Sequence, residues 1–118
     1  MSVQSGIKMC CAVATGAWCS PIQWDWYGYR LVLEETGYGY LVSDYTSPAT
    51  SAQAVCKLRW TIGPRKQIAF QIIQQDGPIR IEGICARYWG SYIEASIAIG
   101  GSKRTHRTPF ERENGLVE

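Results

Sequence analysis

Short runs of β-branched and aromatic residues, bounded by glycine, proline, aspartate or serine, form the main pattern along this chain. Apolar residues seldom recur at the spacing of an amphipathic helix, so the pattern favours β-strands. It predicts eight strands, at residues 12–19, 26–35, 38–45, 54–62, 66–74, 79–87, 91–99 and 104–112. The expected fold class is therefore all-β.

Most of the predicted strands are joined by residues that favour tight turns. Glycine and proline supply the positive or fixed φ that hairpins need, at Thr36-Gly37, Gly63-Pro64-Arg65, Gln75-Asp76-Gly77-Pro78 and Gly100-Gly101. Only residues 46–53 indicate a longer loop. Sequential hairpin-linked strands must protect their edges, and closure into a single antiparallel up-and-down barrel does this most completely. A flattened sandwich is the alternative.

The Gly100-Gly101 turn predicts how the last two strands pair. As a two-residue turn, it places Glu94 directly opposite Arg107 on the solvent side, where opposite charges attract. The predicted interior face carries Ile93, Ala95, Ile97 and Ile99 on one strand, and Arg104, His106, Thr108 and Phe110 on the other. His106, the only histidine, should thus point inward near Ala95.

The Thr36-Gly37 turn similarly predicts the pairing of the second and third strands. Its predicted pairs are Leu33 with Tyr40, Leu31 with Val42, and Tyr29 with Asp44. This register puts Tyr40 and Asp44 inside, on an apolar face with a polar end, as at an open barrel mouth.

The fourth and fifth predicted strands leave two alternatives for the lining of the barrel. Leu58 and Trp60 should face inward, but a regular turn at Pro64-Arg65 places them beside Gln71 and Ala69. Either a bulge shifts the register or glutamines line part of the interior.

The composition is that of a globular protein, since 46% of the 118 residues are hydrophobic and 19% are charged. This length suits one domain over residues 1–118, with 1–11 and 113–118 as loose termini. The net charge is only +2, and the lysines and arginines are scattered, so no basic stripe indicates nucleic-acid binding. No apolar run approaches the ~20 residues that span a bilayer. Neither a nucleic acid nor a membrane span is expected.

Cysteines occur at positions 10, 11, 19, 56 and 85, without the Cys-x-x-Cys spacing of tetrahedral metal sites. Their odd number favours reduced, buried small hydrophobic residues over a disulfide framework. A cytoplasmic protein is therefore expected. Secretion is the alternative, because Lys8 precedes an apolar segment, although Gly16 and Trp18 interrupt the place of a cleavage site.

Three segments carry a family resemblance. They are Gly16-Ala17-Trp18, the Leu31-Val32-Leu33 strand that turns through Gly37 and Gly39 into Tyr40-Leu41-Val42, and Phe110-Glu111-Arg112 on the last strand. In this combination the chain resembles the lipocalin and calycin group of small barrels. The resemblance implies that Trp18 lies at the closed end of the barrel and that Arg112 packs across its ring, where cation and ring attract.

Aromatic residues concentrate where the first strand ends and the second begins. Trp24, Trp26, Tyr27 and Tyr29 should lie at a barrel rim, where they could hold a flat or polycyclic ligand. Alternatively, they cap the barrel end or mark a homodimer contact. The predicted ligand-contacting residues also include Tyr40, Trp60 and His106. Tyr88-Trp89 should lie at the opposite end, so the two aromatic groups do not share one mouth.

Three side chains are candidates for proton transfer. His106 could act as a general acid or base, because imidazole titrates near neutrality, and Asp44 could pair with Tyr29. The alternatives are a structural histidine and an aspartate that bonds its own backbone. The sequence contains no carboxylate pair, nucleophile elbow, phosphate loop or metal-ligand cluster. Neither a metal nor another cofactor is expected.

Two classes of function fit these features. The first is binding of a small, largely hydrophobic molecule inside the barrel. The second is a cofactor-independent cyclase or isomerase of natural-product biosynthesis, in which the barrel orients a flexible polyene or polyketide. A solid barrel with a structural or interaction role is a third reading. Small residues such as Ala69, Gly83, Ala86 and Ala95 favour a cavity.

Overall fold

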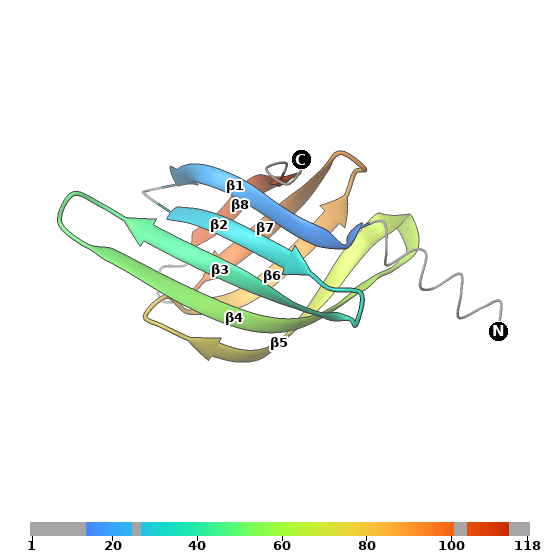
Figure 1. The fold of residues 1–118 in the computed structure, drawn as a ribbon, viewed down its shortest axis with the longest axis horizontal. Helices are drawn as coiled ribbons and strands as arrows, with labels where there is room; N and C mark the ends of the chain where they lie inside the picture. Colours follow the sequence, from blue (N-terminus) through green and yellow to red (C-terminus); the bar gives the residue numbers. More distant parts are fainter. Residues whose placement is uncertain (1–13, 25–26, 101–103, 114–118) are drawn as a thin grey trace.

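The described residues form eight antiparallel β-strands that close into one barrel (Figure 1). The structure, a computed structural model, describes residues 14–24, 27–100 and 104–113, with the backbone alone at 21–24 and 104. The strands follow chain order around the barrel: β1 (Gly16–Trp24), β2 (Tyr27–Leu33), β3 (Tyr38–Thr46), β4 (Ser51–Ile62), β5 (Gln67–Asp76), β6 (Ile81–Tyr88), β7 (Tyr92–Ile99) and β8 (Arg104–Arg112). The predicted all-β up-and-down barrel is confirmed.

The first strand lies further along the chain than the sequence predicts. The expected strand covers residues 12–19, whereas β1 continues through Pro21 to Trp24. Its pairing with β2 shifts between Ser20 and Trp24. At such a bulge a residue without an N–H group can be accommodated, so proline does not end the strand.

The strands β4 and β5 pair in a shifted register. They are connected by a 3-10 turn, η1 (Pro64–Lys66), in which Arg65 has a positive φ of 60°. Two inward pairs follow from this register: Leu58 with Ile72, and Trp60 with Phe70. Gln71 lies exposed on the outer side. The register at Leu58 and Trp60 therefore differs by one residue from that of a regular turn, and Gln71 does not line the interior. The longer turn causes this difference, because the observed bulge lies farther along, between Lys57 and Leu58.

Two of the described strand pairings are short. β1 with β8, and β5 with β6, each pair over two positions: Trp18 with Arg112 and Cys19 with Glu111, then Gln67 with Arg87 and Ile68 with Ala86. Beyond the β5–β6 pairing, Gln75 Oε1 accepts a hydrogen bond from Ile81 N at 2.7 Å, and Gln75 Nε2 donates to Ile81 O at 2.8 Å. A side-chain amide thus replaces backbone pairing where these strands separate.

Large apolar side chains line most of the interior. Those that are almost completely buried include Trp18, Leu31, Leu33, Leu41, Leu58, Trp60, Ile81, Ile93, Ile97 and Phe110. Of the small residues expected to leave space, Ala86 and Ala95 are buried, but Ala69 is exposed on the outside.

The buried indole ring of Trp18 closes one end of the barrel interior, which we call the floor. Its Nε1–H donates to Ala14 O at 2.9 Å, and the ring of Tyr88 packs edge-on with the centroids 6.1 Å apart. The guanidinium carbon of Arg112 lies 4.2 Å from the centre of the Trp18 ring. The contact that the resemblance implies is therefore present.

Gly16 is required by this same arrangement. Its φ is 134°, and a Cβ atom placed there would lie 2.9 Å from Arg112 Nη1. Since L-residues with a side chain rarely adopt this backbone conformation, glycine suits the position on two grounds. The Gly-x-Trp triplet and Arg112 thus form one structural unit.

Candidate functional site

The end of the barrel opposite Trp18 carries inward-facing polar and aromatic side chains. Strand order places the end of β1, the start of β2, the end of β3 and the start of β8 together there (Figure 1). We call this group the polar end, formed by Ser20, Tyr27, Tyr29, Ser43, Tyr45 and His106. The barrel lining therefore changes from apolar at the floor to polar at this end.

Alternation along each strand explains why these side chains point inward. On β2, Tyr27 and Tyr29 precede Leu31 and Leu33 at every second position. Ser43 and Tyr45 continue the inward series after Leu41 on β3, and His106 precedes Thr108 and Phe110 on β8. The series of buried apolar residues thus fixes the orientation of the polar ones.

A buried hydrogen bond joins Tyr29 and His106. The phenol oxygen of Tyr29 lies 2.6 Å from His106 Nδ1, and the two residues are 3% and 4% exposed. Burial raises the pKa of Tyr29, and the negative charge that Tyr27 would carry when ionised raises it further. The phenol therefore stays protonated at neutral pH and can donate to a neutral imidazole.

Aromatic rings surround this hydrogen bond. The rings of Tyr27 and Tyr29 are nearly parallel, with an interplanar angle of 9° and centroids 6.2 Å apart. The ring of Tyr27 also lies 5.1 Å from that of Tyr45 and 5.1 Å from that of His106. This arrangement offers flat apolar surface beside a polar pair, as ligand sites commonly do.

Two serine residues lie on either side of Tyr29, one on each neighbouring strand. Ser20 on β1 and Ser43 on β3 each lie directly opposite Tyr29. They are 7% and 1% exposed, and neither Oγ atom has a hydrogen-bond partner among the groups that the structure describes. An unsatisfied buried hydroxyl costs about 1–3 kcal/mol, so a partner other than these groups, such as a ligand or a water molecule, would stabilise each of them.

The expected Tyr29–Asp44 pair is wrong. The β2–β3 turn is one residue longer than predicted, because Glu34 N donates to Tyr38 O and Leu33 pairs with Gly39. A shift of one residue exchanges the two faces of β3. Asp44 consequently lies on the outer face, where its Oδ1 accepts a hydrogen bond from Gln53 Nε2 at 2.8 Å.

The same shift moves Tyr40 to the outer face, where it is 37% exposed. Its predicted place on the barrel lining is therefore wrong. The shift instead brings Ser43 and Tyr45 inside. The sequence reasoning missed Ser20, Ser43 and Tyr45, but the spacing of Ser43 from Leu41 would have indicated its inward position with the correct turn length.

The pairing of β7 with β8 differs from the prediction by two residues. Ile99 pairs with Arg104, so Arg107 lies opposite Ser96 and not opposite Glu94. Glu94 lies between Arg87 and Pro109 on the neighbouring strands, so its predicted pairing is wrong. A shift of two residues preserves the faces, and the inward position of His106 is confirmed, opposite Ile97.

The other aromatic residues that the sequence analysis singled out do not all lie at the polar end of the barrel. Trp60 is buried in the closed half, where its Nε1–H donates to Glu34 O at 3.0 Å and Tyr38 O at 3.1 Å. It therefore fixes the β2–β3 turn and does not join the polar end. The side chain of Trp24 and all of Trp26 lie outside the described residues. Tyr88 packs against Trp18, at the end of the barrel opposite Tyr27 and Tyr29, as predicted for these three residues.

The described cysteines are free and differ in exposure. Cys56 is buried, and burial raises the pKa of its thiol to about 11. Cys19 is half-buried and Cys85 is exposed, so the expectation of buried cysteines is wrong for Cys85. It sits on the outer face, where β6 alternation places it. Cys10 and Cys11 lie outside the described residues.

Within the ranges that the structure describes, no three His, Cys, Asp or Glu side chains are grouped as a metal site would require. The same ranges contain no helix with the length and apolar character to cross a membrane. No protein-family model matches the chain, and neither a curated protein nor a solved structure is significantly similar to it.

Proposed function

We propose that this barrel binds a small, uncharged, largely apolar molecule at its polar end, as a lipocalin-like ligand-binding protein would. The observation that carries the proposal is the pair of buried hydroxyls, Ser20 and Ser43, on either side of Tyr29 and without a described partner. A ligand oxygen beside either hydroxyl could satisfy it and would lie close to the Tyr29–His106 hydrogen bond, because both serines are directly opposite Tyr29.

The lining favours an uncharged ligand. The side chains that the structure describes at the polar end carry hydroxyls, phenols and one imidazole, and none of them is a carboxylate, lysine or arginine; the side chain of Arg104 lies outside the described residues. A buried charge without an opposite partner is costly, whereas a hydroxyl or carbonyl group can bond to serine and tyrosine.

The rings and the neighbouring small residues favour a flat apolar body. Tyr27 and Tyr29 present nearly parallel faces, and the adjacent inward positions on β4 hold Ala54 and Cys56. Small side chains occupy less of the interior than leucine or phenylalanine would. A polycyclic alcohol or ketone combines the required shape with a single polar group.

Displacement of an uncharged fluorescent dye by polycyclic alcohols tests this proposal. The variant Tyr29→Phe keeps the ring but removes the hydroxyl, and Tyr88→Phe is the matched control at the closed end. While it donates to His106, the Tyr29 oxygen can still accept a hydrogen bond from a ligand hydroxyl, so its loss should weaken alcohol binding by about 2- to 12-fold in Tyr29→Phe alone. Equal affinities in both variants and the wild type, or no dye binding, would contradict it.

The buried Tyr29–His106 hydrogen bond also supports a second candidate, a cofactor-independent isomerase. The Tyr29 oxygen could accept a proton from one ligand carbon while its own proton passes to His106 Nδ1, and the reverse transfer could return a proton at another carbon, so isomerisation consumes no co-reactant. Product analysis of the same mixtures separates the two functions. Isomerisation that His106→Gln abolishes without loss of binding supports catalysis, and unchanged compounds support a carrier.

A further inference from the structure

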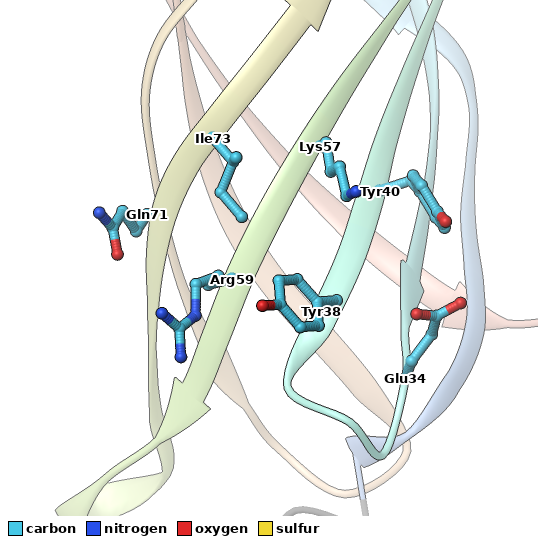
Figure 2. Close-up of a pocket in the computed structure, with 7 residues that line it drawn as sticks. All are labelled: Glu34, Tyr38, Tyr40, Lys57, Arg59, Gln71 and Ile73. Carbon is cyan, nitrogen blue, oxygen red and sulfur yellow. The ribbon is translucent and has the colours of Figure 1, made fainter.

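The outer face of β3, β4 and β5 brings together aromatic and basic side chains that are far apart in the sequence. Figure 2 shows Tyr38 and Tyr40 on β3 beside Lys57 and Arg59 on β4, with Gln71 on β5. We call these five residues the outer basic face. They border a hollow of about 560 Å³ that lies on the opposite side of the strands from the barrel lining.

The two cations are held against one aromatic ring. Lys57 Nζ lies 5.8 Å and the Arg59 guanidinium carbon 5.5 Å from the centre of the Tyr38 ring. Direct strand pairing sets this geometry, since Tyr38 faces Arg59 and Tyr40 faces Lys57. Among the described residues, neither cation forms an ion pair with a carboxylate. Their positive charge therefore remains available to an anion.

The two tyrosines present ring surface on the same side as these cations. Tyr38 and Tyr40 are 40% and 37% exposed, and they are two positions apart on one strand, about 7 Å along it. Each ring could take one planar group. An apolar partner is disfavoured, because it would bury Lys57 and Arg59 without compensation.

The charge balance around the hollow favours an anionic occupant. Glu34 is the one carboxylate among the residues that line it, against Lys57 and Arg59. In Figure 2, Glu34 lies below Tyr40, on the far side of Tyr38 from Gln71. The adjoining turn adds two further exposed cations, Arg65 and Lys66.

We propose that the outer basic face binds single-stranded nucleic acid, with bases stacked on Tyr38 and Tyr40 and phosphates contacting Lys57 and Arg59. A basic groove lined by aromatic rings is the arrangement by which sheet surfaces hold single strands without sequence preference. The sequence did not predict this site, because the two cations lie on a different strand from the two rings and the β3–β4 pairing brings them together. This site is separate from the polar end and does not depend on the ligand proposed for it.

Fluorescence anisotropy with labelled single strands of about 12 nucleotides, a length within the range of known single-strand sites, tests this proposal. Oligothymidylate and oligouridylate distinguish DNA from RNA, and binding of either supports the proposal. With two phosphate contacts, the logarithm of the association constant should fall against the logarithm of salt concentration with a slope of about −1.4.

Variants then locate the site. Lys57→Gln and Arg59→Gln should each reduce the salt slope by about 0.7, whereas the matched control Arg80→Gln, an exposed arginine outside the face, should leave it unchanged. Tyr40→Ala should weaken binding by about 5- to 150-fold through loss of one stacked base. Near-ultraviolet circular dichroism checks that each variant keeps the wild-type fold.

Four outcomes would overturn the proposal. They are no binding at low salt, equal weakening by Arg80→Gln and Arg59→Gln, equally tight binding of a duplex of the same length, and equally effective competition by polyglutamate. The last result would assign the face to an acidic polypeptide. Loss of dye binding at the polar end would not affect this site, so the two proposals can fail separately.

Discussion

Replacement of Trp18 by alanine should lower the free energy of unfolding by about 3–5 kcal/mol, the range for truncation of a buried tryptophan. The ring is completely buried, contacts Tyr88 and Arg112, and donates a hydrogen bond to Ala14 O. It also lies at one of the two positions where β1 pairs with β8. Because small domains are stable by only about 5–15 kcal/mol, much of the stability should be lost.

Urea denaturation followed by far-ultraviolet circular dichroism measures this effect. The matched control is Trp89→Ala, since Trp89 is 49% exposed in the β6–β7 turn and should contribute less than about 1 kcal/mol. Similar losses in the two variants would show that the floor of the barrel does not depend on Trp18. If Trp18→Ala does not fold, Trp18→Phe should give a smaller, measurable loss.

Replacement of Ser43 by alanine should increase stability and weaken ligand binding. The hydroxyl is buried without a described partner, so its removal should raise the free energy of unfolding by about 1 kcal/mol. For a domain of 118 residues that gain corresponds to a rise in Tm of about 4 °C. Binding of a polycyclic alcohol should weaken by about 2- to 12-fold, because one hydrogen bond is lost.

Thermal unfolding and dye displacement on one preparation measure both effects. Ser91→Ala, at an exposed position between β6 and β7, is the control and should change neither quantity. If Ser43→Ala instead lowers Tm and leaves the affinity for the alcohol unchanged, the hydroxyl stabilises the fold and does not bind a ligand.

The fold could be predicted from the sequence because its signals are repeated along the chain. Each strand carries its own alternation, and the turn residues lie between strands, so small errors in single strands leave the barrel unchanged. The contact between Trp18 and Arg112 follows from the resemblance and is present in the structure. The position of β1 was less predictable, since a bulge accommodates Pro21.

The candidate site could be predicted only in part, because its composition depends on turn length. The β7–β8 error of two residues left His106 inside, while the β2–β3 error of one residue exchanged Ser43 for Asp44. Turn residues indicate that a hairpin is present more reliably than they indicate its length. Serines also carry little signal of their own, since most lie on protein surfaces.

The two proposed sites share strand β3 and use its opposite faces. On β3, Ser43 faces the barrel interior while Tyr38 and Tyr40 face outward. Alternation therefore lets one strand contribute an uncharged lining inside and an aromatic surface outside. Variants in the polar end should leave the outer basic face intact, and variants in the outer basic face should leave the polar end intact. Each set of variants is therefore a control for the other set.

A crystal structure of the protein grown with a saturating polycyclic alcohol tests the central claim most directly. We predict density for the alcohol at the polar end, with its hydroxyl oxygen within about 3 Å of Ser20 Oγ or Ser43 Oγ, a normal hydrogen-bond distance. The ring system should contact Tyr27 and Tyr29. The contradicting result is a polar end filled by the protein's own side chains, with both serine hydroxyls bonded to protein groups.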